Sequence, residues 1–209
     1  ISFWFMRRMK MNRMSNLKDL QVNILSGQIM SRITAKPDKD DDIMEIRRVI
    51  VPKAILSDGT IDVSELPEEN LKVPADEKRL TKPGDIVIKL STPYDAAIID
   101  EASAGCIVPS FCAIVRVGDN FDVNYLLAFL NSSLCKEQLK QQVAGMPITV
   151  LSVGKVASVV IPVPSIEEQR EIGTNYIKTQ QKIKVVQQIV ELEAKRNDVV
   201  FKEMVKKYD

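Results

Sequence analysis

The chain has 209 residues with a net charge of +1, and 45% of them are hydrophobic and 27% charged, the composition of one globular domain with an appendage. No histidine occurs, which excludes Ser-His-Asp and Cys-His catalysis and every metal site built on histidine ligands. The three cysteines form no C-x-x-C motif, so the sequence predicts free thiols, no metal or other cofactor, and a cytoplasmic location.

The first predicted elements are short. We expect residues 1–14 to be a leader that derives from the start site or from expression. Residues 17–25 predict a short helix or strand, and residues 64–84, which are polar and interrupted by prolines, predict mostly loop. Apolar strands follow these segments. They are predicted at 86–90, 96–99 and 111–117.

Two helices and a last strand complete the predicted body. Asp122 is placed to cap a helix with Leu126 and Leu130 on one side, and a second helical stretch runs to about residue 143. The last strand is predicted at 156–163. Because helices and strands mix without a regular βαβ alternation, the sequence predicts an α+β fold.

A sharp joint follows the body at residues 161–172, which read IPVPSIEEQREI. Pro162 and Pro164 suit the end or edge of a strand, because they cannot donate ladder hydrogen bonds. Ser165 and Glu168 form an S-x-x-E capping box, in which each side chain satisfies the other residue's backbone N–H. The pattern therefore predicts that a strand ends here and a helix begins.

The helix predicted after this joint runs without proline from residue 166 to residue 207, or about 63 Å at 1.5 Å per residue. One apolar stripe follows its length, so we expect it to meet a partner helix. The alternative is that the helix folds back on its own domain. The residues expected at the dimer seam are Ile172, Tyr176, Ile183, Val186, Ile189 and Val190.

Two catalytic motifs have only weak matches. Residues 91–94 (STPY) are similar to the [DN]-P-P-[YF] motif of adenine methyltransferases, but Ser91 replaces the acceptor that binds the target amino group. A turn after a strand explains them better. Asp38 and Asp76 have the outline of a Mg²⁺-dependent nuclease with a following lysine, yet both lie in loop-like sequence. The sequence therefore favours a binding protein, with such a nuclease as the less favoured alternative.

Several segments together resemble the specificity (S) subunits of type I restriction-modification enzymes. They are LKDLQVNILSG at 17–27, LTKPGDIV at 80–87, NYLLAFLNSS at 124–133, the segment 145–152, and the joint at 161–172. The resemblance implies a target recognition domain at 15–164 and a dimerisation and spacer helix at 165–209. Because S subunits usually contain two such domains and two helices, it implies either a half-subunit or a fragment of a longer subunit.

The resemblance implies recognition of double-stranded DNA without catalysis by this chain. Modification (methyltransferase) subunits, and a motor-nuclease subunit in the complete enzyme, would be its partners, beside a second copy bound through the helix. Basic side chains dominate residues 1–36 and acidic ones residues 37–76, so one face could be basic. The candidate DNA contacts are Arg32, Lys36, Arg47, Arg48, Lys53, Lys78, Arg79, Lys89, Tyr94 and Lys155. The competing interpretation is a coiled-coil protein-interaction module that does not bind DNA.

Overall fold

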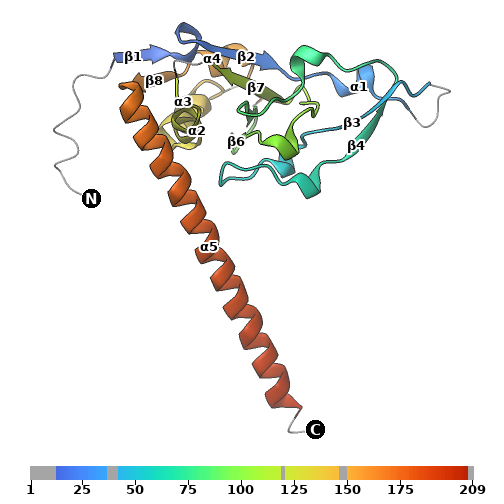
Figure 1. The fold of residues 1–209 in the computed structure, drawn as a ribbon, viewed down its shortest axis with the longest axis vertical. Coiled ribbons are helices and arrows are strands. Elements are labelled where there is room, and N and C mark those ends of the chain that lie inside the picture. Colours follow the sequence, from blue (N-terminus) through green and yellow to red (C-terminus); the bar gives the residue numbers. More distant parts are fainter. Residues whose placement is uncertain (1–12, 37–41, 119–120, 146–149, 207–209) are drawn as a thin grey trace.

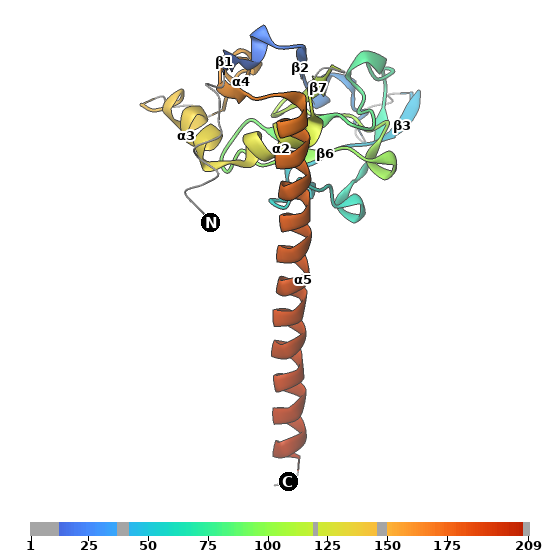
Figure 2. The same ribbon diagram turned by 60° about the vertical axis from the view of Figure 1, so that its left-hand side comes forward.

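The computed structural model describes residues 13–36, 42–118, 121–145 and 150–206 (Figure 1). A body of strands and short helices is followed by one long helix, α5, which leaves the body and ends far from it (Figures 1 and 2). The mixture of helices and strands confirms the predicted α+β fold. Among the described residues, no helix is both long and apolar enough to cross a membrane.

A four-stranded antiparallel sheet forms the centre of the body, in the order β2-β7-β5-β6. Its strands are β2 (Val22–Ser26), β5 (Ile86–Lys89), β6 (Ala96–Ile98) and β7 (Cys112–Val117). These bounds confirm the strands predicted at 86–90, 96–99 and 111–117. The segment 17–25 forms both predicted alternatives in turn, because the 3-10 turn η2 (Leu17–Asp19) precedes β2.

The central strands β5 and β7 are buried on both faces. Their successive side chains point to opposite sides and so enter two different cores. Ile86 and Ile88 belong to a core shared with α2 (Val123–Asn131) and α3 (Ser133–Gln141). Val87 and Ile114 belong to a second core, which the loops around the 3-10 turns η3 (Pro52–Ala54) and η4 (Val63–Glu65) cover. The predicted cap of α2 is confirmed, since the Asp122 carboxylate accepts from the Tyr125 N–H at 2.8 Å.

The two ends of the body's sequence meet in a separate ladder. Strand β1 (Arg13–Asn16) pairs with β8 (Val160–Val163). The boundary expected after residue 14 therefore falls inside β1, while residues 1–12 lie outside the described residues. The strand predicted at 156–163 is too long, because α4 (Val153–Ala157) occupies its first part. Ser152 caps α4 through the N–H of Lys155, which draws that segment into a helical turn.

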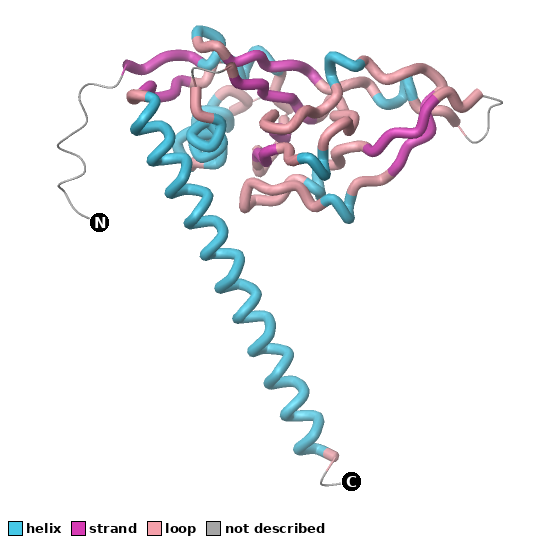
Figure 3. The backbone as a smooth tube through the Cα atoms, in the orientation of Figure 1, coloured by secondary structure: helices cyan, strands magenta, loops and turns pink. Residues whose placement is uncertain are grey.

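A smaller sheet lies at the end of the body away from β1 and β8 (Figures 1 and 3). It pairs β3 (Glu45–Arg48) with β4 (Glu68–Leu71), and α1 (Met30–Ile33) packs beside it. Most of the segment 64–84 is loop and 3-10 turn, as predicted, and it includes η5 (Glu77–Arg79). Strand β4 also lies in this segment and was not predicted. The remaining 3-10 turn is η6 (Glu101–Ser103).

Helix α5 (Ile166–Val205) begins at the predicted capping box. Ser165 Oγ accepts from the Glu168 N–H at 3.3 Å, and the Glu168 carboxylate accepts from the Ser165 N–H at 3.0 Å. The first turns of α5 pack on α2, whereas every residue from 181 to 206 is exposed. Ile172 and Tyr176 were expected at the dimer seam, but they pack on the body's own core.

Candidate nucleic-acid interface

The end of the body that carries β3 and β4 forms a distal lobe, which we define as residues 28–36, 42–50 and 67–80. It has its own small core of Val49, Leu71, Ala75, Leu80 and Ile107. The backbone ties its segments together, since the Lys72 N–H donates to Ile33 O at 2.9 Å and the Ala35 N–H donates to Asn70 O at 2.8 Å. Ile107 connects the lobe to the body through bridges to Val49 and Leu80.

The distal lobe brings together six of the ten expected DNA contacts. They are Arg32, Lys36, Arg47, Arg48, Lys78 and Arg79. Arg32, Lys36 and Lys78 are exposed, and Arg47, Arg48 and Arg79 are half-buried. The sequence scatters these residues over about fifty positions, and the pairing of β3 with β4 gathers them into one part of the surface.

Arg47 and Arg79 are held by acidic neighbours within the lobe. Arg47 pairs with Glu45 and lies 3.5 Å from the Glu77 carboxylate. A hydrogen bond from the Ala75 N–H, together with Arg47, holds the pKa of the Glu45 carboxyl below its ordinary value despite burial. Arg79 lies 3.2 Å from the Asp76 carboxylate. These two arginines therefore organise the lobe.

The other four expected contacts lie elsewhere and are engaged. Lys53, on η3, pairs with Glu65, and the Lys155 ammonium donates to Gln142 O at 2.7 Å. Lys89 Nζ lies 3.1 Å from the Asp95 carboxylate inside the body. Tyr94 is only 1% exposed and belongs to the main core, so its expected role as a DNA contact is wrong. Its burial leaves no face on which a base could stack.

A charged cluster that the sequence did not reveal lies beside Tyr94. Asp95 is 5% exposed, and its two carboxylate oxygens accept from Lys136 at 2.7 Å and from Lys89 at 3.1 Å. Burial disfavours the ionised carboxyl, but the hydrogen bonds from the two lysines outweigh it and hold the pKa of Asp95 below its ordinary value. Lys136 comes from α3, so the cluster ties α3 to the edge of the central sheet.

The Gly-Asp-Ile element at 84–86 has a structural role in this fold. The Asp85 carboxylate accepts from Arg116 Nε at 2.8 Å and Nη2 at 2.7 Å, and also from the Lys82 N–H at 2.8 Å. Gly84 adopts φ +85°, a conformation that favours glycine. Arg116 Nη2 also donates to Leu80 O at 3.2 Å. The element thus locks the turn before β5 onto β7.

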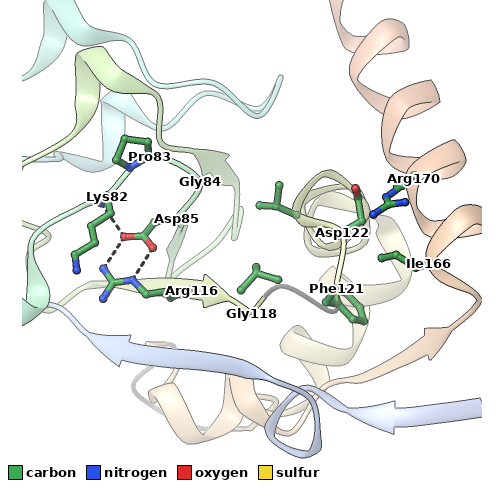
Figure 4. Close-up of a pocket in the computed structure, with 12 residues that line it drawn as sticks. Lys82, Pro83, Gly84, Asp85, Arg116, Gly118, Phe121, Asp122, Ile166 and Arg170 are labelled. Atoms are coloured by element: carbon green, nitrogen blue, oxygen red, sulfur yellow. Dashed lines mark hydrogen bonds and ion pairs between the residues drawn. The ribbon is translucent and has the colours of Figure 1, made fainter.

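This turn borders a cavity of about 430 Å³ between the body and the start of α5 (Figure 4). Asp85 and Arg116 lie on one side, and Asp122, Ile166 and Arg170 lie on the other. Two segments that carry the family resemblance, 80–87 and 161–172, therefore line the same hollow. Sequence spacing alone could not indicate that they meet.

The joint between body and helix is held by buried polar contacts. Gln169 is 2% exposed, and its side chain accepts from the Asp122 N–H and donates to Pro164 O, both at 3.0 Å. Tyr125 Oη donates to Pro162 O at 2.7 Å. A Cβ on Gly173 would lie 2.6 Å from Asp122 Oδ1 and 2.7 Å from the Tyr125 backbone nitrogen, so α5 packs on α2 too closely at this point for a larger residue.

The weak nuclease match has no support among the described residues. Asp38 lies outside them. Asp76 is occupied as the cap of η5, where its carboxylate accepts from the Lys78 N–H at 3.0 Å, and it also pairs with Arg79. In the part of the chain that the structure describes, no group of three or more cysteine or acidic side chains is placed to hold a metal ion.

No family model matches the sequence, and no curated protein does either. Among solved structures, the chain is similar to one that describes complex assembly and conformational transition of the type I R-M system, with 20% identity over 90% of this chain and a TM-score of 0.62. It is similar to the HsdS subunit from Thermoanaerobacter tengcongensis, with 19% identity over 88% of this chain and a TM-score of 0.63. It is also similar to the type I S subunit from M. genitalium, with 16% identity over 88% of this chain and a TM-score of 0.51.

The chain spans less than half of each of these three solved chains, namely 43%, 45% and 42% of their lengths. The part that it matches includes both the body and the long helix, because about nine-tenths of this chain is covered. The chain therefore has the fold of one part of a type I specificity subunit, a globular domain followed by a long helix.

Proposed function

We propose that this chain recognises a specific sequence in double-stranded DNA as the noncatalytic specificity subunit of a type I restriction-modification enzyme. The observation that carries the proposal is the fold, in which a body like that of type I S subunits is joined through buried contacts to one long helix. The cationic side chains gathered on the distal lobe support it, because proteins bind DNA chiefly through arginine and lysine contacts to phosphate.

In this proposal the distal lobe meets the DNA. Arg32, Lys36 and Lys78 are exposed on it and suit contacts to phosphate oxygens. The chemistry belongs to partners: modification subunits supply the methyl donor and the adenine-binding pocket, and a motor-nuclease subunit joins them in the complete enzyme. We place this assembly in the cytoplasm, in keeping with the three buried free cysteines.

The exposed part of α5 supports assembly with a second copy. Ile183 and Val186 are 42% and 58% exposed, and Ile189 and Val190 are 54% and 63% exposed. Such a run of exposed apolar side chains on a helix is typical of an interface that the isolated chain leaves open. A two-fold dimer would place the same stripe against itself in antiparallel orientation, with one body at each end.

This geometry makes the helix a spacer. Lys184 of the helix still pairs with Asp58 of the body at 3.6 Å. Residues 185–205 extend about 32 Å beyond this contact at 1.5 Å per residue. The contacts of Gln169 and Gly173 set the direction in which the helix leaves. Two identical recognition domains held this way would read a palindrome whose half-sites are separated by a distance that the helix pair determines.

The proposal is tested by sequencing methylated adenines in the genome of the organism that encodes the chain, with and without its gene. We expect one palindromic motif to lose methylation when the gene is absent and to regain it on complementation. An unchanged methylation pattern would contradict the role as specificity subunit. It would favour the competing interpretation, a coiled-coil module that binds only protein.

A further inference from the structure

The two-stranded ribbon of β3 and β4 has two chemically different faces. Side chains alternate along each strand, so Glu45 and Arg47 share the inner face with Glu69 and Leu71. Leu71 is fully buried, and Arg47 is held by Glu45 and Glu77. This inner face belongs to the core of the distal lobe and cannot meet a ligand.

The outer face consists of Ile46 and Arg48 from β3 and of Glu68 and Asn70 from β4. Ile46 stands opposite Asn70 and Arg48 stands opposite Glu68 in the register of the two strands. Ile46 is 57% exposed, Glu68 and Asn70 are exposed, and Arg48 is half-buried. None of the three polar side chains has a hydrogen-bond or ion-pair partner in the part of the chain that the structure describes.

The tip of the ribbon continues this exposed surface. Ile43 and Met44 precede β3, Val73 follows β4, and the pairing of Glu45 with Leu71 places them at the same end. They are 57%, 64% and 46% exposed. Exposed apolar side chains at the tip of a ribbon, next to polar groups without partners, indicate a surface that is covered in a complex.

The side-chain types on the outer face match those that read base edges. Arginine binds the O6 and N7 atoms of guanine, asparagine binds the N6 and N7 atoms of adenine, and glutamate accepts from the N4 amino group of cytosine. An apolar side chain suits the methyl group of thymine. A two-stranded ribbon, with strands about 4.8 Å apart, also fits the major groove, which is about 12 Å wide.

We propose that the outer face of the β3–β4 ribbon enters the DNA major groove, with Arg48 and Asn70 as its base-reading side chains. Resting on the proposed function, this assigns sequence reading to one element of the domain. The backbone holds that element in place, since Val49 N–H donates to Pro67 O at 3.0 Å and Ile107 N–H donates to Arg48 O at 2.9 Å. Arg32 and Lys78 then contact phosphates on the flanks, outside the groove.

The test uses the full chain and a pool of duplexes with a randomised core. The parent chain selects a motif, and its affinity is then measured for the selected duplex and for a scrambled one. Arg48→Lys keeps the charge but loses the bidentate contact, so it should lower affinity for the selected duplex by about 5- to 150-fold. Affinity for the scrambled duplex should stay within about twofold of the parent value. Asn70→Ala should alter the selected motif at one position per half-site.

Lys53→Gln is the control, because Lys53 pairs with Glu65 outside the distal lobe. We expect it to select the parent motif with the parent affinity. If Arg48→Lys and Asn70→Ala also select the parent motif with unchanged affinity, the ribbon does not read bases and the inference is overturned. If they leave the motif intact but weaken assembly in sedimentation velocity, the face binds protein, which overturns the inference too. A parent chain that selects no motif would overturn both this inference and the proposed function.

Discussion

Gln169 joins the long helix to the body, because its side-chain carbonyl accepts a hydrogen bond from the Asp122 N–H at 3.0 Å. Asp122 is the N-cap of α2, so the first turn of α5 is bonded to the first turn of the helix that it crosses. Four residues after Gln169 along α5, Gly173 lets the two helices approach without a side chain between them. The direction of α5 is therefore set by a few buried contacts near its start.

Replacing Gln169 with alanine should destabilise the chain by about 2 kcal/mol, because the Asp122 N–H and Pro164 O would both lose their buried partner. Urea unfolding followed by circular dichroism measures this difference. Thr174→Ala is the control, since Thr174 is exposed on the same helix and should change the free energy of unfolding by no more than about 0.5 kcal/mol. Equal free energies of unfolding for the two variants would show that the hydrogen bonds of Gln169 do not stabilise the connection between α5 and the body.

Replacing Asp95 with asparagine should destabilise the chain by about 3 kcal/mol at neutral pH, because Lys89 and Lys136 lose the carboxylate that they share. The pKa of Asp95 is lowered in the folded chain. Its contribution is therefore present above the carboxyl's unfolded pKa and is lost as the pH falls through the lower folded value.

Urea unfolding of the parent and of Asp95→Asn between pH 7 and pH 3 checks this dependence. The difference in the free energy of unfolding between parent and variant should become smaller as the pH falls below about 4. Asp198→Asn, on the exposed part of α5, should stay within about 0.5 kcal/mol of the parent throughout. If this difference in the free energy of unfolding does not change with pH, the charge of the Asp95 carboxylate does not stabilise the cluster.

Replacing Val186 and Ile189 together with glutamate should abolish the homodimer, because the change would place like charges across the proposed axis at a cost of several kcal/mol. Sedimentation velocity at tens of micromolar should find a dimeric parent and a monomeric variant. Glu191→Lys lies outside this stripe and should remain dimeric. A parent chain that is already monomeric at that concentration would contradict the homodimer.

Replacing Arg32 and Lys78 with glutamine should weaken binding to all duplexes alike, since phosphate contacts carry no sequence information. The slope of log affinity against log salt concentration should fall by about two. Fluorescence anisotropy with a labelled duplex over a salt series measures it. Lys53→Gln, whose lysine pairs with Glu65 outside the distal lobe, should keep the parent slope. An unchanged slope in the double variant would place Arg32 and Lys78 off the DNA.

The elements that could be predicted are those with a local signal. The capping box of Ser165 and Glu168 marks the start of α5, and the apolar runs of β5 and β7 mark buried strands. Strand β4 has no such signal, because its sequence, EENL, is acidic and favours neither pattern. It forms because β3 lies beside it and because Leu71 fills the small core of the distal lobe.

The candidate site was predictable only in part, for a related reason. Sequence indicates which residues are cationic, but not which of them a carboxylate already holds. Lys89 and Arg47 have acidic partners in the folded chain, and Tyr94 is buried by the packing of α2 and the central sheet. Ile172, Tyr176 and Ile183 belong to the same apolar stripe of α5. Ile172 and Tyr176 pack on the body, whereas Ile183 is left exposed, and the sequence does not show where contact with the body ends.

The central claim is sequence-specific recognition of DNA, and the most direct test compares the chain's affinity for two duplexes at physiological salt. One duplex carries the motif whose methylation depends on the gene, and the other has the same composition with the motif scrambled. The account predicts that the first is bound at least about 10³-fold more tightly. Equal affinity for the two duplexes, or no binding to either, would contradict it.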